Sequence, residues 1–126
     1  KQAFGEFKNS GDPICWLNIT GQTIPILDFF SETGADLFNI DYLVPISIAM
    51  EKLPHHCING NIKSFTFISG ETKEIQREAK DLLTQTKCRG GFVLGPGCEI
   101  PLESKVSNIE AMMAAVNGWP GLIDWK

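Results

Sequence analysis

A thiol and a carboxylate, Cys98 and Glu99, directly follow the run GGFVLGPG at residues 90–97. A cysteine sulfur can bind a metal or attack a carbon once it is a thiolate, and a neighbouring carboxylate can hold or accept a proton. The two glycines of the Gly-Pro-Gly turn relieve crowding of the backbone, and its proline stiffens the turn. We therefore expect this turn to hold Cys98 in one direction at the end of a strand.

Polar residues also stand where three other apolar runs end. They are Asn18 and Thr20 after the first run, Asp41 after the second and Asn61 after the third. In parallel βα architectures, binding groups gather where strands end and loops begin. The sequence therefore predicts that these four residues and Glu99 line a substrate pocket.

Structural roles for the same residues stay open at this point. Asp41 can cap the next turn. Asn61 can occupy a left-handed turn beside Gly60. Cys98 can be a small apolar filler.

The segments that would hold these residues alternate between strand-like and helix-like patterns of apolar residues. Apolar, β-rich runs favour strands at 14–19, 35–41, 55–62 and 90–97. Helical patterns follow them at 24–34, 46–53, 69–87 and 107–119, with Ser69 as the expected N-cap of the longest helix, and the end of another helix precedes them at 1–11. Continuously apolar strands separated by helices are typical of parallel βαβ units.

Four such units are half of a closed (βα)8 barrel, which takes roughly 250 residues. The chain has 126 residues, so we expect one α/β domain over 1–126 that is half of a TIM barrel. Four parallel strands alone leave two open edges and an uncovered inner face. The other half is expected from residues outside this chain or from a second copy, unless the sheet stays open.

Composition restricts the classes of protein further. The net charge is −4 and the basic residues form no cluster, which argues against nucleic acid as a partner. No apolar run approaches the ~18 residues of a membrane span. The cysteines, including Cys15, Cys57 and Cys88, never form a CxxC motif. They indicate reduced thiols in a cytoplasmic protein. The N-terminus lacks the apolar segment of a signal peptide, and the chain begins at Lys1, as expected for part of a longer gene product.

The run GGFVLGPGCEIPLESKVSNIEAMMAAV at 90–116 resembles the last βα unit of the uroporphyrinogen decarboxylase superfamily. It is most similar to the branch of cobalamin-dependent methyltransferases that methylate coenzyme M and similar thiols. Three further stretches resemble the family in the expected order: WLNITGQTIPIL at 16–27, FSETGADLFNID at 30–41 and INGNI at 58–62. The resemblance covers nearly the whole chain and implies the C-terminal half of the family's barrel.

This resemblance implies methyl transfer between a corrinoid, presented by a partner protein, and a thiol or related acceptor. The methyltransferases hold a zinc ion with a His-x-Cys pair and the cysteine of the final turn. Here the pair is replaced by Asn18 and Thr20, whose oxygens are poor zinc ligands, and Cys98 remains. We therefore do not expect zinc, and Cys98 is a metal ligand only if zinc is retained.

We do not expect another cysteine or histidine to replace the two missing zinc ligands. His55, His56 and Cys57 begin their predicted strand, whereas Cys98 follows the end of its own. A strand of five residues separates the two ends by about 15 Å.

The decarboxylase branch resembles this chain less closely. Its Gly-His-Gly near the last strand corresponds to Pro96 here, and its key aspartate and arginines lie in the N-terminal half of that family's barrel. Decarboxylation of a tetrapyrrole therefore stands behind methyl transfer. A non-catalytic half-barrel module that dimerises or binds a partner is the second alternative, and decarboxylation is the third. The sequence assigns no catalytic residue and leaves open whether the chain is an enzyme.

Overall fold

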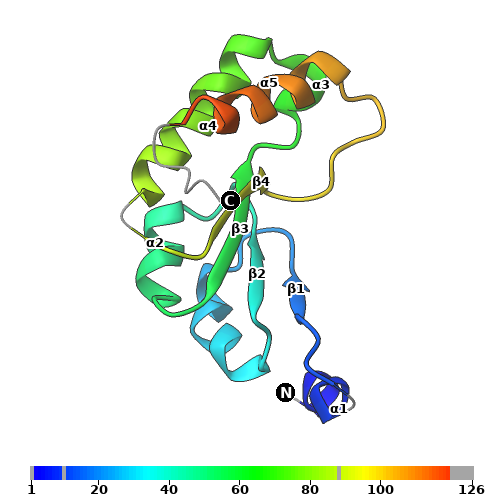
Figure 1. Cartoon of the computed structure of the whole chain (residues 1–126), viewed down its shortest axis with the longest axis vertical. Coiled ribbons are helices and arrows are strands. Elements are labelled where there is room, and N and C mark those ends of the chain that lie inside the picture. The colour runs from blue at the N-terminus through cyan, green and yellow to red at the C-terminus, as the bar shows by residue number, and fades with distance from the viewer. Residues whose placement is uncertain (1, 10, 88, 120–126) are drawn as a thin grey trace.

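The computed structural model describes residues 2–9, 11–87 and 89–119. Helices and strands alternate after an N-terminal helix (Figure 1). They are α1 (Gln2–Asn9), β1 (Trp16–Asn18), η1 (Ile24–Thr33), β2 (Leu37–Ile40), α2 (Ile46–Lys52), β3 (Cys57–Ile62), α3 (Thr66–Ser69), α4 (Thr72–Thr86), β4 (Phe92–Pro96) and α5 (Val106–Asn117). Within these ranges no helix is both long and apolar enough to cross a membrane.

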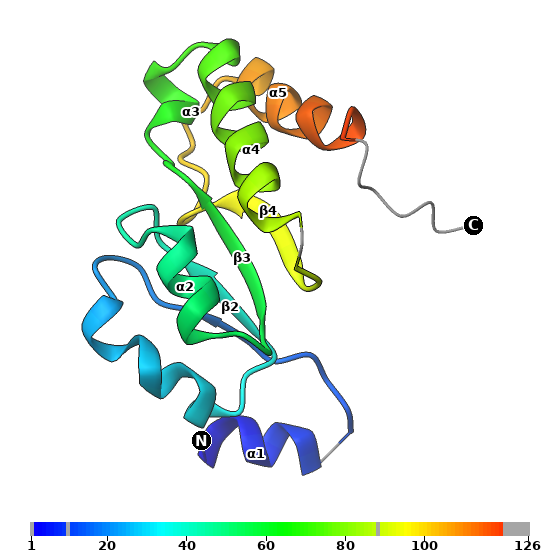
Figure 2. The same cartoon turned by 90° about the vertical axis from the view of Figure 1, so that its left-hand side faces the viewer.

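All four strands belong to one parallel sheet in the order β1-β2-β3-β4. The register is uniform: Asn18 pairs with Asn39, Asn39 with Asn59, and Asn59 with Val93. Figures 1 and 2 show η1, α2 and α4 on one side of this sheet. The predicted α/β fold of four parallel βα units is thereby confirmed, and the arrangement is that of a partial TIM barrel.

The local predictions needed three corrections. The segment 24–33 is a 3-10 helix, which ends at Gly34 in the left-handed conformation. A short helix, α3, precedes α4 and ends at Ser69, so the prediction of Ser69 as the N-cap of α4 is wrong. The cap is Glu71, which forms a reciprocal capping box with Glu74. The last helix, expected from residue 107, begins at Val106 as α5, and its N-cap is Lys105.

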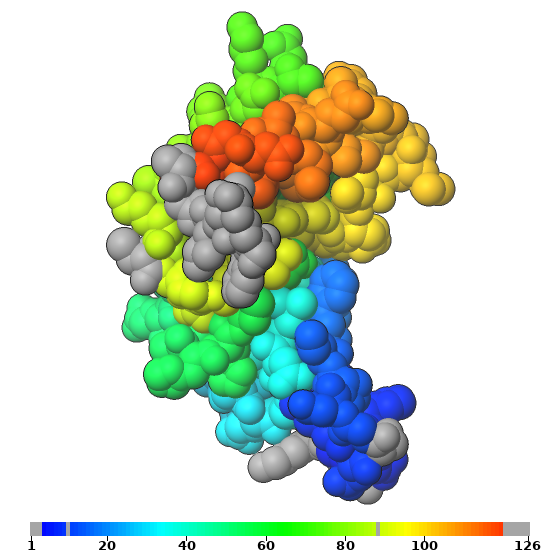
Figure 3. All heavy atoms as spheres, in the orientation of Figure 1, coloured from blue at the N-terminus to red at the C-terminus, as the bar shows by residue number. Residues whose placement is uncertain are grey.

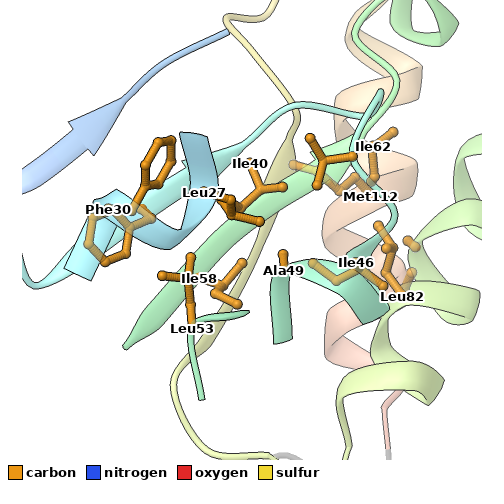
Figure 4. Close-up of a cluster of buried hydrophobic side chains, with 14 of the residues drawn as sticks. Leu27, Phe30, Ile40, Ile46, Ala49, Leu53, Ile58, Ile62, Leu82 and Met112 are labelled. Carbon is orange, nitrogen blue, oxygen red and sulfur yellow. The ribbon is translucent and has the colours of Figure 1, made fainter. Parts of the chain in front are cut away.

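The hydrophobic core lies between the sheet and the helices (Figure 4). Ile40 of β2 and Ile58 of β3 are fully buried, as are Leu27 of η1 and Leu53 after α2. Because side chains alternate across a strand, this packing turns every second side chain of β2 and β3 toward the helices. The residues between them face the other side, where a closed barrel has its interior.

Candidate functional site

The carboxyl ends of the four strands meet at one edge of the sheet, as the parallel order requires. We call this edge the rim and define it by Asn18, Thr20, Asp41, Asn61 and the segment 97–99. A hydrogen bond 2.7 Å long from the Gly97 N–H to the Ile62 carbonyl joins the ends of β4 and β3. The residues that the sequence analysis selected at the strand ends therefore lie at one edge of the sheet.

Asp41 connects two loops of the rim. It is 5% exposed, and its Oδ2 accepts the N–H of Gly21 at 2.7 Å while its Oδ1 accepts the N–H of Leu43 at 2.9 Å. Both carboxylate oxygens are thus used within the chain. The geometry gives Asp41 a positioning role, in which it ties the loop after β1 to the end of β2.

Asn61 supports the same loop from the next strand. Its side-chain amide donates to the carbonyls of Asp41 at 3.2 Å and Val44 at 2.8 Å. The side chain of Asn61 is buried. Asn18 and Thr20, by contrast, are exposed at the end of β1, where a ligand at the rim can reach them.

The Gly-Pro-Gly turn brings β4 into close contact with these residues. A Cβ atom on Gly97 would lie 2.5 Å from the Tyr42 nitrogen and 3.1 Å from the Asp41 carbonyl carbon. A Cβ on Gly95 would lie 2.6 Å from the side-chain nitrogen of Asn59. Both glycines are therefore required by close packing, and they set the position of Cys98 over the rim.

Cys98 and Glu99 form a hydrogen-bonded pair at the rim. The thiol of Cys98 donates to Oε2 of Glu99 at 2.6 Å. This bond, followed by partial burial, raises the pKa of the Cys98 thiol, and the negative charge of Asp41 acts in the same direction. The same bond lowers the pKa of Glu99. Cys98 is therefore a neutral thiol at pH 7 beside an ionised carboxylate.

The sequence did not predict a second polar group, which lies just below the rim. Asn39 donates to Oδ1 of Asn59 at 2.7 Å and to the Pro96 carbonyl at 3.2 Å, and Asn59 donates to the Val93 carbonyl at 3.0 Å. Both asparagines are more than 90% buried. The pair links three strands beneath Cys98, and its only signal in the sequence is an asparagine inside each of two apolar runs.

The described residues do not fit a zinc site. Over 2–9, 11–87 and 89–119, no group of three or more His, Cys, Asp or Glu side chains is placed to hold a metal ion. Cys57 begins β3, at the amino end of the sheet, and His56 packs edge-on against Phe38 there, with ring centroids 5.2 Å apart. As expected, these residues lie at the opposite end from Cys98. Cys15, Cys57 and Cys98 are free thiols, and Cys88 lies outside the described residues.

Comparison with known proteins assigns the chain to a family. The family model described as uroporphyrinogen decarboxylase (URO-D) matches residues 1–119. The chain belongs to this family, and the suspected relationship is confirmed.

Two relatives define the similarity more closely. Uroporphyrinogen decarboxylase of Anaeromyxobacter dehalogenans (strain 2CP-C) is 27% identical over 95 residues, which are 74% of this chain and 27% of that protein. A solved methyltransferase from Methanosarcina mazei superposes with a TM-score of 0.78 and is 28% identical, over 92% of this chain and 34% of the other. The chain thus spans about a third or less of the length of either relative.

Proposed function

We propose that this chain forms the thiol-bearing part of the rim of a methyltransferase that moves a methyl group from a corrinoid to a thiol or related acceptor. One observation carries the proposal. A chain similar to a methyltransferase over 92% of its length holds Cys98 on a rigid, closely packed turn at the carboxyl edge of the sheet. The substrate and the whole activity belong to the proposal, because the chain covers only part of that relative.

The proposed step requires few groups from this chain. The acceptor sulfur forms a bond to the methyl carbon as the methyl–cobalt bond breaks, and the bonding electron pair stays with the cobalt. The proton of the acceptor thiol passes to Glu99, the exposed carboxylate that Cys98 holds in place through its hydrogen bond. No step uses zinc, since the described residues lack a ligand set for it. The corrinoid is a substrate delivered by a partner protein.

Asn18 and Thr20 are the residues of the rim that we assign to substrate contact. Both are exposed, and their amide and hydroxyl groups can donate and accept hydrogen bonds without adding charge. Asp41 and Asn61 are assigned to holding the loops, since their side-chain hydrogen bonds are made within the chain.

The test measures methyl transfer from methylcobalamin to 2-mercaptoethanesulfonate, followed by loss of the methylcobalamin absorbance and by mass spectrometry of the thioether. Cys98→Ala removes the donor that holds Glu99 in place and should lower the rate at least tenfold. Cys57→Ala is the matched control, because Cys57 lies at the opposite end of the sheet, and its rate should equal that of the wild type. Equal loss in both variants, or no turnover by folded wild-type chain, would contradict the proposal and favour a non-catalytic module.

Decarboxylation of uroporphyrinogen is the second candidate, favoured by the name of the curated relative. The rim carries the carboxylates Asp41 and Glu99, which repel a substrate that itself bears carboxylates. Of the described arginines, Arg77 lies on α4, and Arg89 donates to the carbonyls of Met50 and Leu53 near the amino end of β3. The described rim therefore fits this substrate less well than a thiol.

A further inference from the structure

A cavity of about 320 Å³ lies on the helix side of the sheet, between α2 and α4. Figure 3 shows the green atoms of α2 and the yellow-green atoms of α4 along one side of the molecule, away from the blue atoms of β1. This volume is within the range of small-molecule binding sites. The cavity is separate from the rim residues Cys98 and Glu99, which do not line it.

Two consecutive βα units build this cavity. Its lining residues all lie between Tyr42 and Gln85, and they include the end of β3, a central strand of the described sheet. Any further strand of a barrel would join beside β1 or β4, which are the outer strands. The walls of the cavity therefore do not depend on such strands.

Apolar side chains form the base of the cavity. Ile46 of α2 and Leu82 of α4 lie next to each other there (Figure 4), and Ile62 of β3 is 1% exposed beside them. Tyr42 also lines the cavity and is 42% exposed. The site therefore offers an aromatic ring and apolar surface to the carbon atoms of a ligand.

Glu78 and Asp81 bring two carboxylates to the same cavity. They are three residues apart on α4, and such residues project from one face of a helix. Oε2 of Glu78 is fully buried and has no hydrogen-bond partner within the described residues, while the residue as a whole is partly exposed. Burial raises the pKa of this carboxyl group, and the backbone N–H and the charge of Lys63 offset part of the effect. A carboxylate oxygen in this position is stabilised by a cation beside it.

A cation of the chain itself already lies in the cavity. Nζ of Lys63 is 5.6 Å from the centroid of the Tyr42 ring, which is within the range of a cation–π interaction. Lys63 is exposed, so water can replace the ring as the partner of its ammonium group. The two carboxylates outnumber this one ammonium group, and the cavity has a net negative charge. Lys63 thus shows which kind of group the ring of Tyr42 accepts.

We propose that this cavity binds a small organic cation, such as a primary ammonium group on a short carbon chain. The ammonium group would pair with Glu78 and Asp81 and displace Lys63 from the ring of Tyr42, and the carbon chain would lie against the apolar base. A metal ion fits less well, because the described part of the chain places no three His, Cys, Asp or Glu side chains around a common point. This inference does not depend on methyl transfer.

Tyr42 provides a direct measurement, because it is the only tyrosine of the chain. Isotope-labelled tyrosine therefore gives one set of ring signals in an NMR spectrum. Titration with butylammonium in mildly alkaline buffer, at constant ionic strength, should shift these signals until they saturate. Butyrate, an anion of similar size, and Mg²⁺ should leave the signals in place.

Three variants test which groups bind the cation. Glu78→Gln removes one carboxylate charge and should weaken the binding of butylammonium by about tenfold. Glu51→Gln is the matched control, because Glu51 is exposed on α2 and does not line the cavity, and it should bind like the wild type. Lys63→Met removes the competing ammonium group and should tighten binding severalfold. Circular dichroism checks that each variant is folded.

Four results would overturn the inference. The first is the absence of a saturable shift with butylammonium. The second is an equal shift with butyrate or Mg²⁺, because the site would then not select an organic cation. The third is unchanged binding in Glu78→Gln. The fourth is weaker binding in Lys63→Met, because Lys63 would then assist the ligand instead of competing with it.

Discussion

Gly97→Ala is predicted to be the most informative single change at the rim. The added Cβ would stand 2.5 Å from the backbone nitrogen of Tyr42 and 3.1 Å from the carbonyl carbon of Asp41. Backbone atoms cannot rotate away as a flexible side chain can, so β4 must shift. Overpacking of this kind costs about 1 to 3 kcal/mol. The shift would also lengthen the 2.7 Å hydrogen bond from Gly97 to Ile62, so we expect the upper part of that range.

Gly90→Ala is the control for this substitution. Gly90 is exposed, its φ is not positive, and a Cβ there meets no atom within 4 Å. The same chemical change should therefore be neutral, or stabilise the chain by about 0.4 to 1 kcal/mol through the unfolded state.

Urea unfolding followed by circular dichroism measures both variants under one set of conditions. Gly97→Ala should lower the midpoint with an unchanged slope, and Gly90→Ala should leave it in place or raise it. The Cys98 thiol should also react differently with an alkylating reagent in Gly97→Ala, because the turn that positions it has moved. Equal midpoints for the two variants would refute the claim that close packing, rather than turn flexibility, requires glycine at position 97.

Three further predictions concern the polar groups. Asn59→Ala removes the acceptor of Asn39 and leaves a buried amide partly unpaired, so urea unfolding should show a loss of roughly 1 to 3 kcal/mol; a loss near zero would show that the pair does not stabilise the sheet. Burial raises the pKa of Glu78 above its ordinary 4.5, so the folded chain retains this proton to higher pH than the unfolded chain, and stability falls as pH rises above 4.5. Glu78→Gln should therefore be more stable than the wild type near neutral pH and lose this advantage well below 4.5, and lower stability at neutral pH would contradict the assignment. Glu99→Gln weakens the hydrogen bond that chiefly raises the pKa of Cys98 and removes the charge that adds to it. Iodoacetamide should therefore alkylate Cys98 several times faster below the thiol's ordinary pKa; peptide mapping reads the rate, and an unchanged rate would show that Glu99 does not control the thiol.

Some features of the rim could be predicted from the sequence because they depend on residues that are neighbours in the chain. Each apolar run ends in polar residues, and parallel strands bring their carboxyl ends to one edge, so Asp41, Asn61 and Cys98 were assigned to a common rim. The Gly-Pro-Gly turn identified β4 and the position of its thiol for the same reason. The resemblance to the uroporphyrinogen decarboxylase family rested on these turns, and the family comparison confirmed it.

Contacts between residues that are far apart in the sequence could not be predicted from the sequence. Asn39 and Asn59 are twenty positions apart, and they meet only because the register of β2 and β3 places them at the same level. Likewise, the need for glycine at position 97 comes from the approach of β4 to Asp41, which no local pattern encodes. The N-cap of α4 is Glu71 and not the predicted Ser69, because Ser69 is the last residue of the short helix α3.

The sequence by itself determined the alternation of strands and helices, since the period of apolar residues reports which face of each element is buried. It also determined which side chains stand at the strand ends. Only the tertiary structure decided which of these remain available to a ligand. Asp41 and Asn61 are occupied by main-chain N–H and carbonyl groups from other loops, while Asn18 and Thr20 stay exposed. The physical reason is that hydrogen-bond partners of a buried polar group are chosen by proximity in space, which packing sets.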